Sequence, residues 1–227
     1  MKYTTIDDFT EYGKYLIYGA PGTRKTTFAS TFPNPVWIDL ERSTDTLRHI
    51  HAPEGIAVMR PKKMQEIIDI IKDFPKSEFE TLVVDTATRL QIFQLAEQMK
   101  DMIAKNSSRD KYLPYQADYR RSGALLDELF SALQECDKNV VIIAHQKTFI
   151  DEETKRVTAV RPDLTPRLAD AVSGLLNCVG YSEVKNNVQI MHFNSFGKVF
   201  AKNRLNIQEP ITNPTYENCF HTTKKEK

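Results

Sequence analysis

The sequence predicts an α/β domain, in which a mostly parallel central sheet is flanked by helices and followed by antiparallel strands near the C-terminus. Three observations predict this fold class. Short apolar runs alternate with helical patterns between Lys14 and Lys147, as in parallel strands joined by helices. A glycine-rich turn joins the first apolar run to the first helix. From Asn177 onward, apolar runs follow one another with an Asn-Asn turn between two of them, which is typical of a hairpin.

The composition is that of an ordinary globular protein. Of the 227 residues, 27% are charged and 41% hydrophobic, and the net charge of +1 provides no overall field for nucleic acid, so any such site must be local. The cysteines Cys136, Cys178 and Cys219 lack C-x-x-C spacing, which argues against a zinc site or a disulfide framework. No apolar run approaches the roughly 20 residues that span a bilayer. Residues 1–10 contain two aspartates instead of a signal peptide, so we expect a cytoplasmic protein with no membrane partner.

The glycine-rich turn has the order of a phosphate-binding loop. The stretch Leu16–Thr27 reads LIYGAPGTRKTT, which matches G-x-x-x-x-G-K-[ST] at every position but one. Backbone N–H groups in such a turn and at the following helix start attract phosphate oxygens. We expect Lys25 to contact the β- and γ-phosphates of ATP, and the Thr26 hydroxyl to bind Mg²⁺. The candidate ATP-binding residues of the turn are Gly19, Ala20, Pro21, Gly22, Thr23, Arg24, Lys25, Thr26 and Thr27.

Arg24 is the departure from this motif, because it stands where the last glycine is expected. Its side chain either points outward and leaves the phosphate cradle intact, or crowds the phosphates and weakens binding. A third interpretation is a turn rich in glycine and proline, Gly19–Gly22, that binds nothing. The order of strand, turn, lysine, hydroxyl and helix favours a nucleotide site over this third interpretation.

The remaining elements follow from apolar periodicity and from helix-ending prolines. Buried strands are expected at Lys14–Tyr18, from Val36, at Gly55–Met59, Leu82–Val84 and Asn139–Lys147, and C-terminal strands at Asn177–Val184, Val188–Phe193 and Lys198–Ala201. Helices are expected at Lys25–Thr31, Pro61–Asp73, from Ala87, and at Gly123–Glu135 and Thr165–Ser173.

Polar side chains follow three of the expected strands, and functional groups in open α/β sheets gather at such carboxyl ends. Glu41 is a candidate general base that deprotonates water, or else a helix cap or a solvated residue. Asp85 follows the run Leu82–Val84 and is a candidate Mg²⁺ ligand. Gln146, or His145, is a candidate for sensing the γ-phosphate, with a structural histidine as the alternative.

Two polar stretches are expected to project from the domain. Lys105–Arg121 is expected to form a long, mobile loop, and Phe149–Pro166 a hairpin or loop that turns at Asp151–Thr154. Basic residues interleaved with tyrosines in the first stretch are suited to single-stranded DNA, with an ordinary solvated loop as the alternative. The second stretch, which carries several basic residues, is placed where a nucleic-acid-binding or partner loop would project, although an inert hairpin is equally consistent with it.

The C-terminal part carries a pair of cations. Lys202 and Arg204 are expected two residues apart on one face of a strand, an arrangement that is unfavourable unless they are solvated or face an anion. We expect one domain over residues 1–205 and a tail over 206–227, which is disordered or loosely docked beyond Gln208.

Together these motifs resemble the RecA-like ATPase core, and most closely the small phage-encoded RecA-core proteins of single-strand annealing and recombination. The resemblance covers about residues 14–205 and is carried by the phosphate turn and the segments WIDLERSTD, TLVVDTATRL, IIAHQK and AKNRLN. It implies that Glu41 activates water, that Asp85 is the Walker B aspartate, and that His145 and Gln146 couple the γ-phosphate to DNA-binding loops.

AKNRLN resembles the K-x-R finger of RecA-core ring proteins, which implies that Lys202 and Arg204 act in the active site of a neighbouring subunit. The resemblance thus implies ATP and Mg²⁺ as cofactors, single-stranded DNA and further copies of the chain as partners, and phage recombination or replication in the host cytoplasm. The alternative is a nucleotide-sensing loader or adaptor for a replication protein with little hydrolysis, which Arg24 motivates. A small-molecule kinase is less favoured, because no basic lid follows the Walker B helix.

Overall fold

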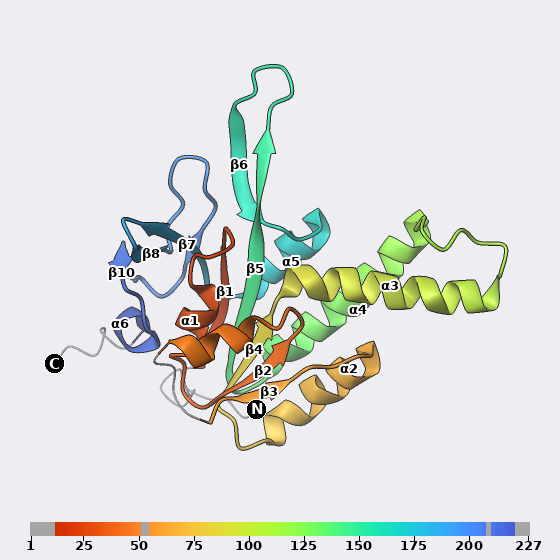
Figure 1. Cartoon of the computed structure of the whole chain (residues 1–227), viewed down its shortest axis with the longest axis horizontal. Coiled ribbons are helices and arrows are strands. Elements are labelled where there is room, and N and C mark those ends of the chain that lie inside the picture. Colours follow the sequence, from red (N-terminus) through yellow and green to blue (C-terminus); the bar gives the residue numbers. More distant parts are fainter. Residues whose placement is uncertain (1–11, 51–54, 208–209, 221–227) are drawn as a thin grey trace, which may run out of the picture.

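A mixed sheet of ten strands forms the centre of the computed structural model, which describes residues 12–50, 55–207 and 210–220 (Figure 1). The strands are β1 (Lys14–Gly19), β2 (Pro35–Asp39), β3 (Ala57–Met59), β4 (Thr81–Asp85), β5 (Asn139–Ile150), β6 (Val157–Pro162), β7 (Cys178–Lys185), β8 (Val188–His192), β9 (Lys202–Asn203) and β10 (Ile211–Thr212). The helices are α1 (Lys25–Ala29), α2 (Met64–Asp73), α3 (Ala87–Lys105), α4 (Gln116–Glu135), α5 (Pro166–Leu175) and α6 (Tyr216–Phe220), with 3₁₀ turns η2 (Ser43–His49) and η3 (Phe74–Lys76).

The strand order is β10-β8-β7-β1-β5-β4-β2-β3, with β6 paired to β5 and β9 to β7. The strands from β7 to β3 pair in parallel, whereas β8 and β10 are antiparallel additions. The predicted fold class is therefore confirmed. The register places Gly19 beside His145 and Asp39 beside Asp85, so the polar ends of four strands meet at one edge of the sheet.

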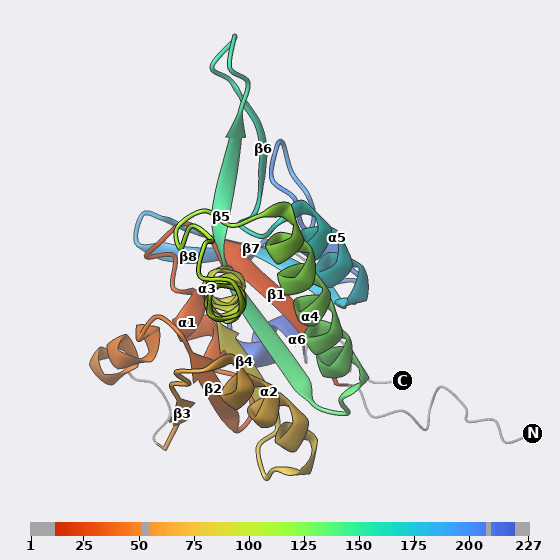
Figure 2. The same cartoon turned by 90° about the vertical axis from the view of Figure 1, so that its right-hand side faces the viewer.

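Alternating side chains of the central strands build two apolar layers, one on each face of the sheet. Leu16, Val84 and Ile142 belong to the layer that is covered by α2, α3, α4 and α5. Ile17 and Val141 belong to the opposite layer, to which α1 and α6 contribute. Figure 2 shows α4 and α5 side by side against the sheet. Since these strands are fully buried, their carboxyl ends are held rigidly beneath the site.

Two hairpins project from the body of the molecule (Figure 1). The first is the expected β-hairpin, in which β5 continues past the sheet edge and pairs with β6 from Gln146↔Pro162 to Ile150↔Val157. The second is formed by α3 and α4. Both hairpins begin close to the edge where the polar strand ends gather.

The expectation of a mobile loop over Lys105–Arg121 is wrong for its second half, because α4 begins at Gln116. Asp118 forms a capping box with Tyr115, accepting a hydrogen bond from the Tyr115 backbone N–H at 2.8 Å. It also forms a buried ion pair with Arg109, whose guanidinium lies 4.3 Å from the centroid of the Tyr115 ring. These contacts order the helix start despite its polar composition.

The strand expected at Lys198–Ala201 is also wrong. Gly197 has a positive φ of 52°, and Phe196 and Val199 exchange backbone hydrogen bonds across the turn that it forms. Beyond this turn, Val199 forms only an isolated parallel bridge with Val160, and the regular strand β9 covers Lys202–Asn203, so Arg204 lies just outside it.

The segment 210–220 is docked on the domain, which corrects the expectation of a loose tail. β10 pairs with β8, and the Tyr216 backbone N–H donates to Thr31 Oγ1 at 2.8 Å. The Phe220 ring lies 4.3 Å from that of Tyr15 and 5.8 Å from that of Phe32. Aromatic burial therefore outweighs the turn-forming residues of this segment. The parts of the predicted tail at 208–209 and 221–227 lie outside the described residues, and the division at residue 205 stays a prediction.

Candidate nucleotide-binding site

The phosphate turn connects β1 to α1 and depends on two glycines. At Gly19, an added Cβ atom would lie 2.2 Å from the Ser182 carbonyl oxygen, so only glycine allows this approach. Gly22 has a φ of +78°, a left-handed conformation that glycine adopts without steric cost. The turn is thus shaped as a P-loop at Gly19, the motif glycine that the sequence retains, and at Gly22, an additional glycine within the loop.

Arg24 occupies the left-handed conformation that normally calls for glycine, with φ 60° and ψ 29°. For other residues this region costs roughly 1–2 kcal/mol, which explains the glycine of the motif. Its guanidinium points out of the loop and donates a hydrogen bond to Asn187 Oδ1 at 2.6 Å. Of the two placements considered from the sequence, the structure has the outward one.

Lys25 is buried within the loop that it follows. Its ammonium group donates to the carbonyl oxygens of Gly19 at 3.0 Å and Ala20 at 2.7 Å. Burial lowers the pKa of Lys25 to about 8, although nearby Asp85 and Glu41 act in the opposite direction. An anion beside this ammonium group would favour its charged form and thereby offset the lowering of its pKa.

Asp85 is 1% exposed and accepts hydrogen bonds from Ser43 Oγ at 2.6 Å and Thr26 Oγ1 at 3.0 Å. Burial raises its pKa to about 6, while the two hydroxyl groups act to lower it. Carboxylate and hydroxyl oxygens suit Mg²⁺ that arrives with a triphosphate. The described residues contain no group of three His, Cys, Asp or Glu that would hold an ion on its own. Asp85 and Thr26 therefore fit a cation that the nucleotide helps to bind.

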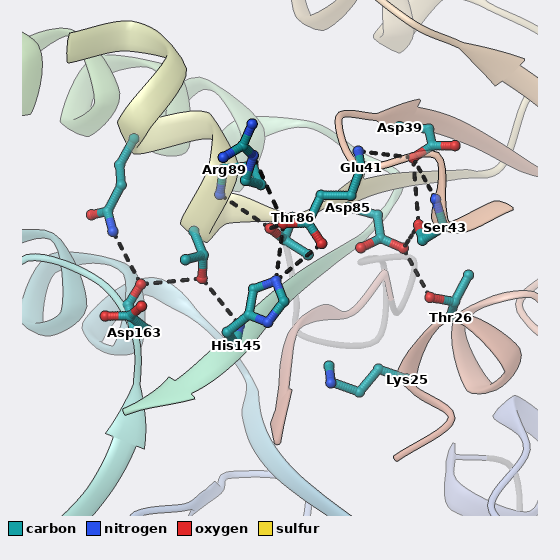
Figure 3. Close-up of polar contacts among 12 residues, drawn as sticks. Lys25, Thr26, Asp39, Glu41, Ser43, Asp85, Thr86, Arg89, His145 and Asp163 are labelled. Atoms are coloured by element: carbon teal, nitrogen blue, oxygen red, sulfur yellow. Dashed lines mark hydrogen bonds and ion pairs between the residues drawn. The ribbon is translucent and has the colours of Figure 1, made fainter. Parts of the chain in front are cut away.

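Glu41 is held on the opposite side of the site from Lys25 (Figure 3). Its two carboxylate oxygens lie 2.9 and 3.0 Å from His145 Nε2, and Thr86 Oγ1 donates to one of them at 3.2 Å. Asp39, not Glu41, caps the following turn, because Asp39 accepts from the backbone N–H groups of Ser43 and Thr44. The interpretation of Glu41 as a helix cap is therefore wrong.

These side chains surround a cavity of about 390 Å³, within the range of small-molecule sites. Its lining comprises Pro21, Gly22, Thr23, Arg24, Lys25, Thr26, Thr27, Glu41, Ser43, Thr46, Ile50, Asp85, Thr86, Ile143 and His145. The turn residues Gly19 and Ala20 lie just behind this lining, where their carbonyls bind Lys25.

Gln146 is not brought into this cavity, although His145 is. Successive strand residues point to opposite faces, and the Gln146 side chain accepts a hydrogen bond from the Tyr181 hydroxyl at 3.3 Å on the other face. The expectation that both polar residues face the phosphate site is corrected to His145 alone.

Lys202 and Arg204 lie at the opposite end of the sheet. β9 pairs with β7 at Cys178 and Val179, which lie beside Tyr15 and Leu16 of β1, about 10–13 Å along that strand from Gly19 at roughly 3.3 Å per residue. The Lys202 ammonium donates to the carbonyls of Ser173 and Gly174. The pair does not meet Lys25 within one chain, and its role in a neighbouring subunit stays a prediction.

Several residues of the site carried no sequence motif. Thr86 follows Asp85 directly and Ser43 lies two residues after Glu41, and this proximity to the acidic residues is the signal that would have found them. Ser182 and Gln189 bind the P-loop backbone from more than 150 positions away, and no local pattern marks them.

A P-loop, a buried aspartate and a second carboxylate at the carboxyl edge of a mostly parallel sheet define a RecA-like P-loop nucleotide-binding protein, of the class that uses ATP and Mg²⁺. More narrowly, the chain belongs to a family described as an AAA domain (AAA_24), whose model matches residues 11–205.

Among solved structures, the chain resembles a KaiC-like protein from the hyperthermophilic archaeon Pyrococcus horikoshii OT3. The TM-score is 0.50 at 13% identity, and the match covers 90% of this chain and 85% of the other, which supports the fold alone. Comparison with curated protein sequences gives no significant match. In the described part of the chain, no helix has both the length and the apolar character needed to cross a membrane.

Proposed function

We propose that this chain hydrolyses ATP and acts on single-stranded DNA, in phage recombination or annealing within a host cell. The observation that carries the proposal is the position of Glu41 across the cavity from Lys25. A P-loop alone supports binding, whereas a carboxylate facing the phosphate position supports attack by water.

Different residues of the cavity would bind the phosphates, hold Mg²⁺ and activate water. The loop N–H groups and Lys25 would bind the β- and γ-phosphates, and Asp85 and Thr26 would hold Mg²⁺, which when bound offsets the charge of the phosphates. Glu41 would orient a water molecule and accept its proton. His145 Nε2 contacts both oxygens of Glu41, and the remaining lone pairs of this carboxylate can accept a hydrogen bond from the attacking water.

The β5–β6 hairpin supports single-stranded DNA as a partner. Lys147 and Arg161 are directly opposed across the hairpin, and although Asp163 Oδ1 lies 3.9 Å from the Lys147 ammonium, both cations are exposed and suited to a phosphate backbone. Phe149, two residues after Lys147, is 42% exposed and available for base stacking. The hairpin continues directly from His145, which joins this surface to the nucleotide cavity.

The α3–α4 hairpin provides a second basic and aromatic surface. Tyr112 is 80% exposed at the connection between the helices, and the Lys111 ammonium lies 4.8 Å from the centroid of its ring. Self-association is part of the same proposal, because Lys202 and Arg204 reach a nucleotide only in another copy of the chain.

The test is ATP hydrolysis by the wild-type protein, Lys25→Ala and Glu41→Gln, each with and without an oligonucleotide. We expect Lys25→Ala to abolish hydrolysis, and Glu41→Gln to bind ATP but lose about 10²- to 10⁴-fold in rate, the usual contribution of a general base. Glu128→Gln, at an exposed position on α4, is the matched control. Unchanged hydrolysis by Lys25→Ala would refute the mechanism.

A second candidate function is a nucleotide-sensing loader or adaptor with little hydrolysis. The contact of His145 with both Glu41 oxygens favours it, because His145 competes with water for the candidate base. Stimulation of hydrolysis by single-stranded DNA would support the first function. Absence of DNA binding at low salt would support the second.

A further inference from the structure

The hairpin of β7 and β8 contacts both ends of the P-loop, at Gly19 and at Thr23 and Arg24. At the first end, the Ser182 carbonyl lies against Gly19 so closely that no side chain fits there. At the second end, Ser182 Oγ donates to the Thr23 carbonyl at 2.6 Å. The Gln189 amide donates to the carbonyls of Thr23 at 3.1 Å and Arg24 at 3.2 Å. The hairpin thus contacts the loop from behind along its length.

The side chains of Ser182 and Gln189 are buried and form hydrogen bonds with the loop. They are 0% and 4% exposed, and Gln189 Nε2 also lies 3.0 Å from Ser182 Oγ. Because both loop partners of Gln189 are carbonyl oxygens, which only accept, the nitrogen of its amide must face them. A buried donor of this kind is costly to leave without a partner, so it helps to fix the direction of the loop carbonyls. The Arg24 carbonyl also accepts a hydrogen bond from the Phe28 N–H of α1 at 3.0 Å. The Thr23 carbonyl is held by Gln189 and Ser182.

The direction of these carbonyls determines the direction of the loop N–H groups. In a planar trans peptide the C=O and N–H bonds point to opposite sides. Holding the carbonyls of Thr23 and Arg24 toward the hairpin therefore turns the N–H groups of Arg24 and Lys25 away from it. Neither Ser182 nor Gln189 lines the cavity, whereas Arg24 and Lys25 do.

The same hairpin also holds the residue that replaces the glycine of the motif. Arg24 is in the left-handed region, and its guanidinium is bound to Asn187 in the turn between β7 and β8. Asn187 has a positive φ of 61°, which presents its side chain at the tip of the turn. This contact stabilises the left-handed residue and keeps its charge on the outer side of the loop.

We propose that Gln189, Ser182 and Asn187 are positioning residues for the phosphate-binding loop. They keep its N–H groups aimed at the phosphate position, and they make a functional loop compatible with Arg24. The inference rests on the proposed nucleotide binding and adds a requirement that the P-loop motif itself does not contain.

The test is equilibrium binding of a fluorescent ATP analogue with Mg²⁺ to the full-length chain. We expect Gln189→Ala to bind about tenfold more weakly, which corresponds to about 1.4 kcal/mol, and Asn187→Ala to bind several-fold more weakly. Lys185→Ala is the matched control in the same hairpin, since its ammonium contacts only Glu183 among the described side chains. Its affinity should equal that of the wild type.

The Arg24→Gly background separates positioning from general loss of structure. Glycine adopts the left-handed conformation freely, so Gln189→Ala and Asn187→Ala should each cost at least threefold less in affinity there than in the wild type. A merely structural role would cost the same factor in both backgrounds. Thermal unfolding of each variant identifies the temperature at which all are folded, and the titrations are made there.

The outcomes distinguish this inference from the function on which it rests. If the wild-type chain does not bind the analogue, the proposed function and the positioning role are both refuted. If the wild type binds and Gln189→Ala binds equally well, only the positioning role is refuted. If Gln189→Ala does not fold, the exposed Asn187→Ala decides, and additivity with Arg24→Gly then overturns the inference.

Discussion

ATP binding should be accompanied by uptake of a proton at Lys25. Burial lowers the pKa of this ammonium group from 10.5 to about 8, a shift worth about 3 kcal/mol at 1.36 kcal/mol per pH unit. A bound triphosphate places several negative charges beside Lys25 and should restore a pKa above 10. Binding should then take up about 0.1 proton at pH 7, about 0.5 at pH 8 and about 0.9 at pH 9.

The uptake is measured by calorimetric titration with ATP in buffers of different ionisation enthalpy. Lys25→Arg is the control, because arginine keeps its charge throughout this pH range. Any proton that the nucleotide exchanges appears equally in both proteins. Above pH 8, the affinity of the wild type should fall by about tenfold per pH unit relative to the variant. Equal proton uptake by the two proteins at pH 8 would refute the assignment of Lys25 to the phosphates.

Two further predictions concern Asp85 and the docked segment 210–220. The pKa of Asp85 is raised by burial to about 6, so this carboxyl is protonated below that pH, and its own contribution to stability falls as the pH rises between about 4 and 6. Mg²⁺ with ATP favours the ionised form of Asp85, so it should raise the melting temperature of the protein more at pH 7.5 than at pH 5. The Asp85→Asn variant should not show this difference between the two pH values. An effect of Mg²⁺ that is the same at both pH values in the wild type would contradict the prediction. Phe220→Ala should lower the free energy of unfolding in urea by about 2–3 kcal/mol, somewhat below the cost for a fully buried ring, because Phe220 stacks on Tyr15 and Phe32. The neighbouring exposed Glu217→Ala should change it by less than about 0.5 kcal/mol, and equal effects of the two would show that the docked segment contributes no packing.

The parts of the site that the sequence predicted are those that depend on local patterns. The P-loop is a contiguous motif, and Glu41, Asp85 and His145 each follow a buried apolar run. Parallel strands bring such ends together, so their convergence followed from the fold class alone. Their individual partners did not follow, since the contact of Glu41 with His145 joins positions that lie 104 residues apart.

Other features depend on long-range geometry that no local pattern encodes. Whether His145 or Gln146 faces the cavity depends on which face of β5 lies toward α1, and a shift of one residue would exchange them. The outward position of Arg24 depends on Asn187, which is brought near only by the pairing of β7 with β1. The start of α4 was missed because a buried ion pair between Arg109 and Asp118 overrides a polar, loop-like composition.

The length of β5 has a mechanical consequence. This strand is twelve residues long, its first half is paired on both sides with β1 and β4, and its second half extends into the projecting hairpin, where the pairing with β6 shifts register between Phe149 and Ile150. His145 lies where the clamped part gives way to the free part, and its carbonyl accepts a hydrogen bond from the returning chain at Asp163. Because the strand is held at one end only, a force on the tip of the hairpin bends it most where the held part ends. That point is His145, the residue that contacts Glu41.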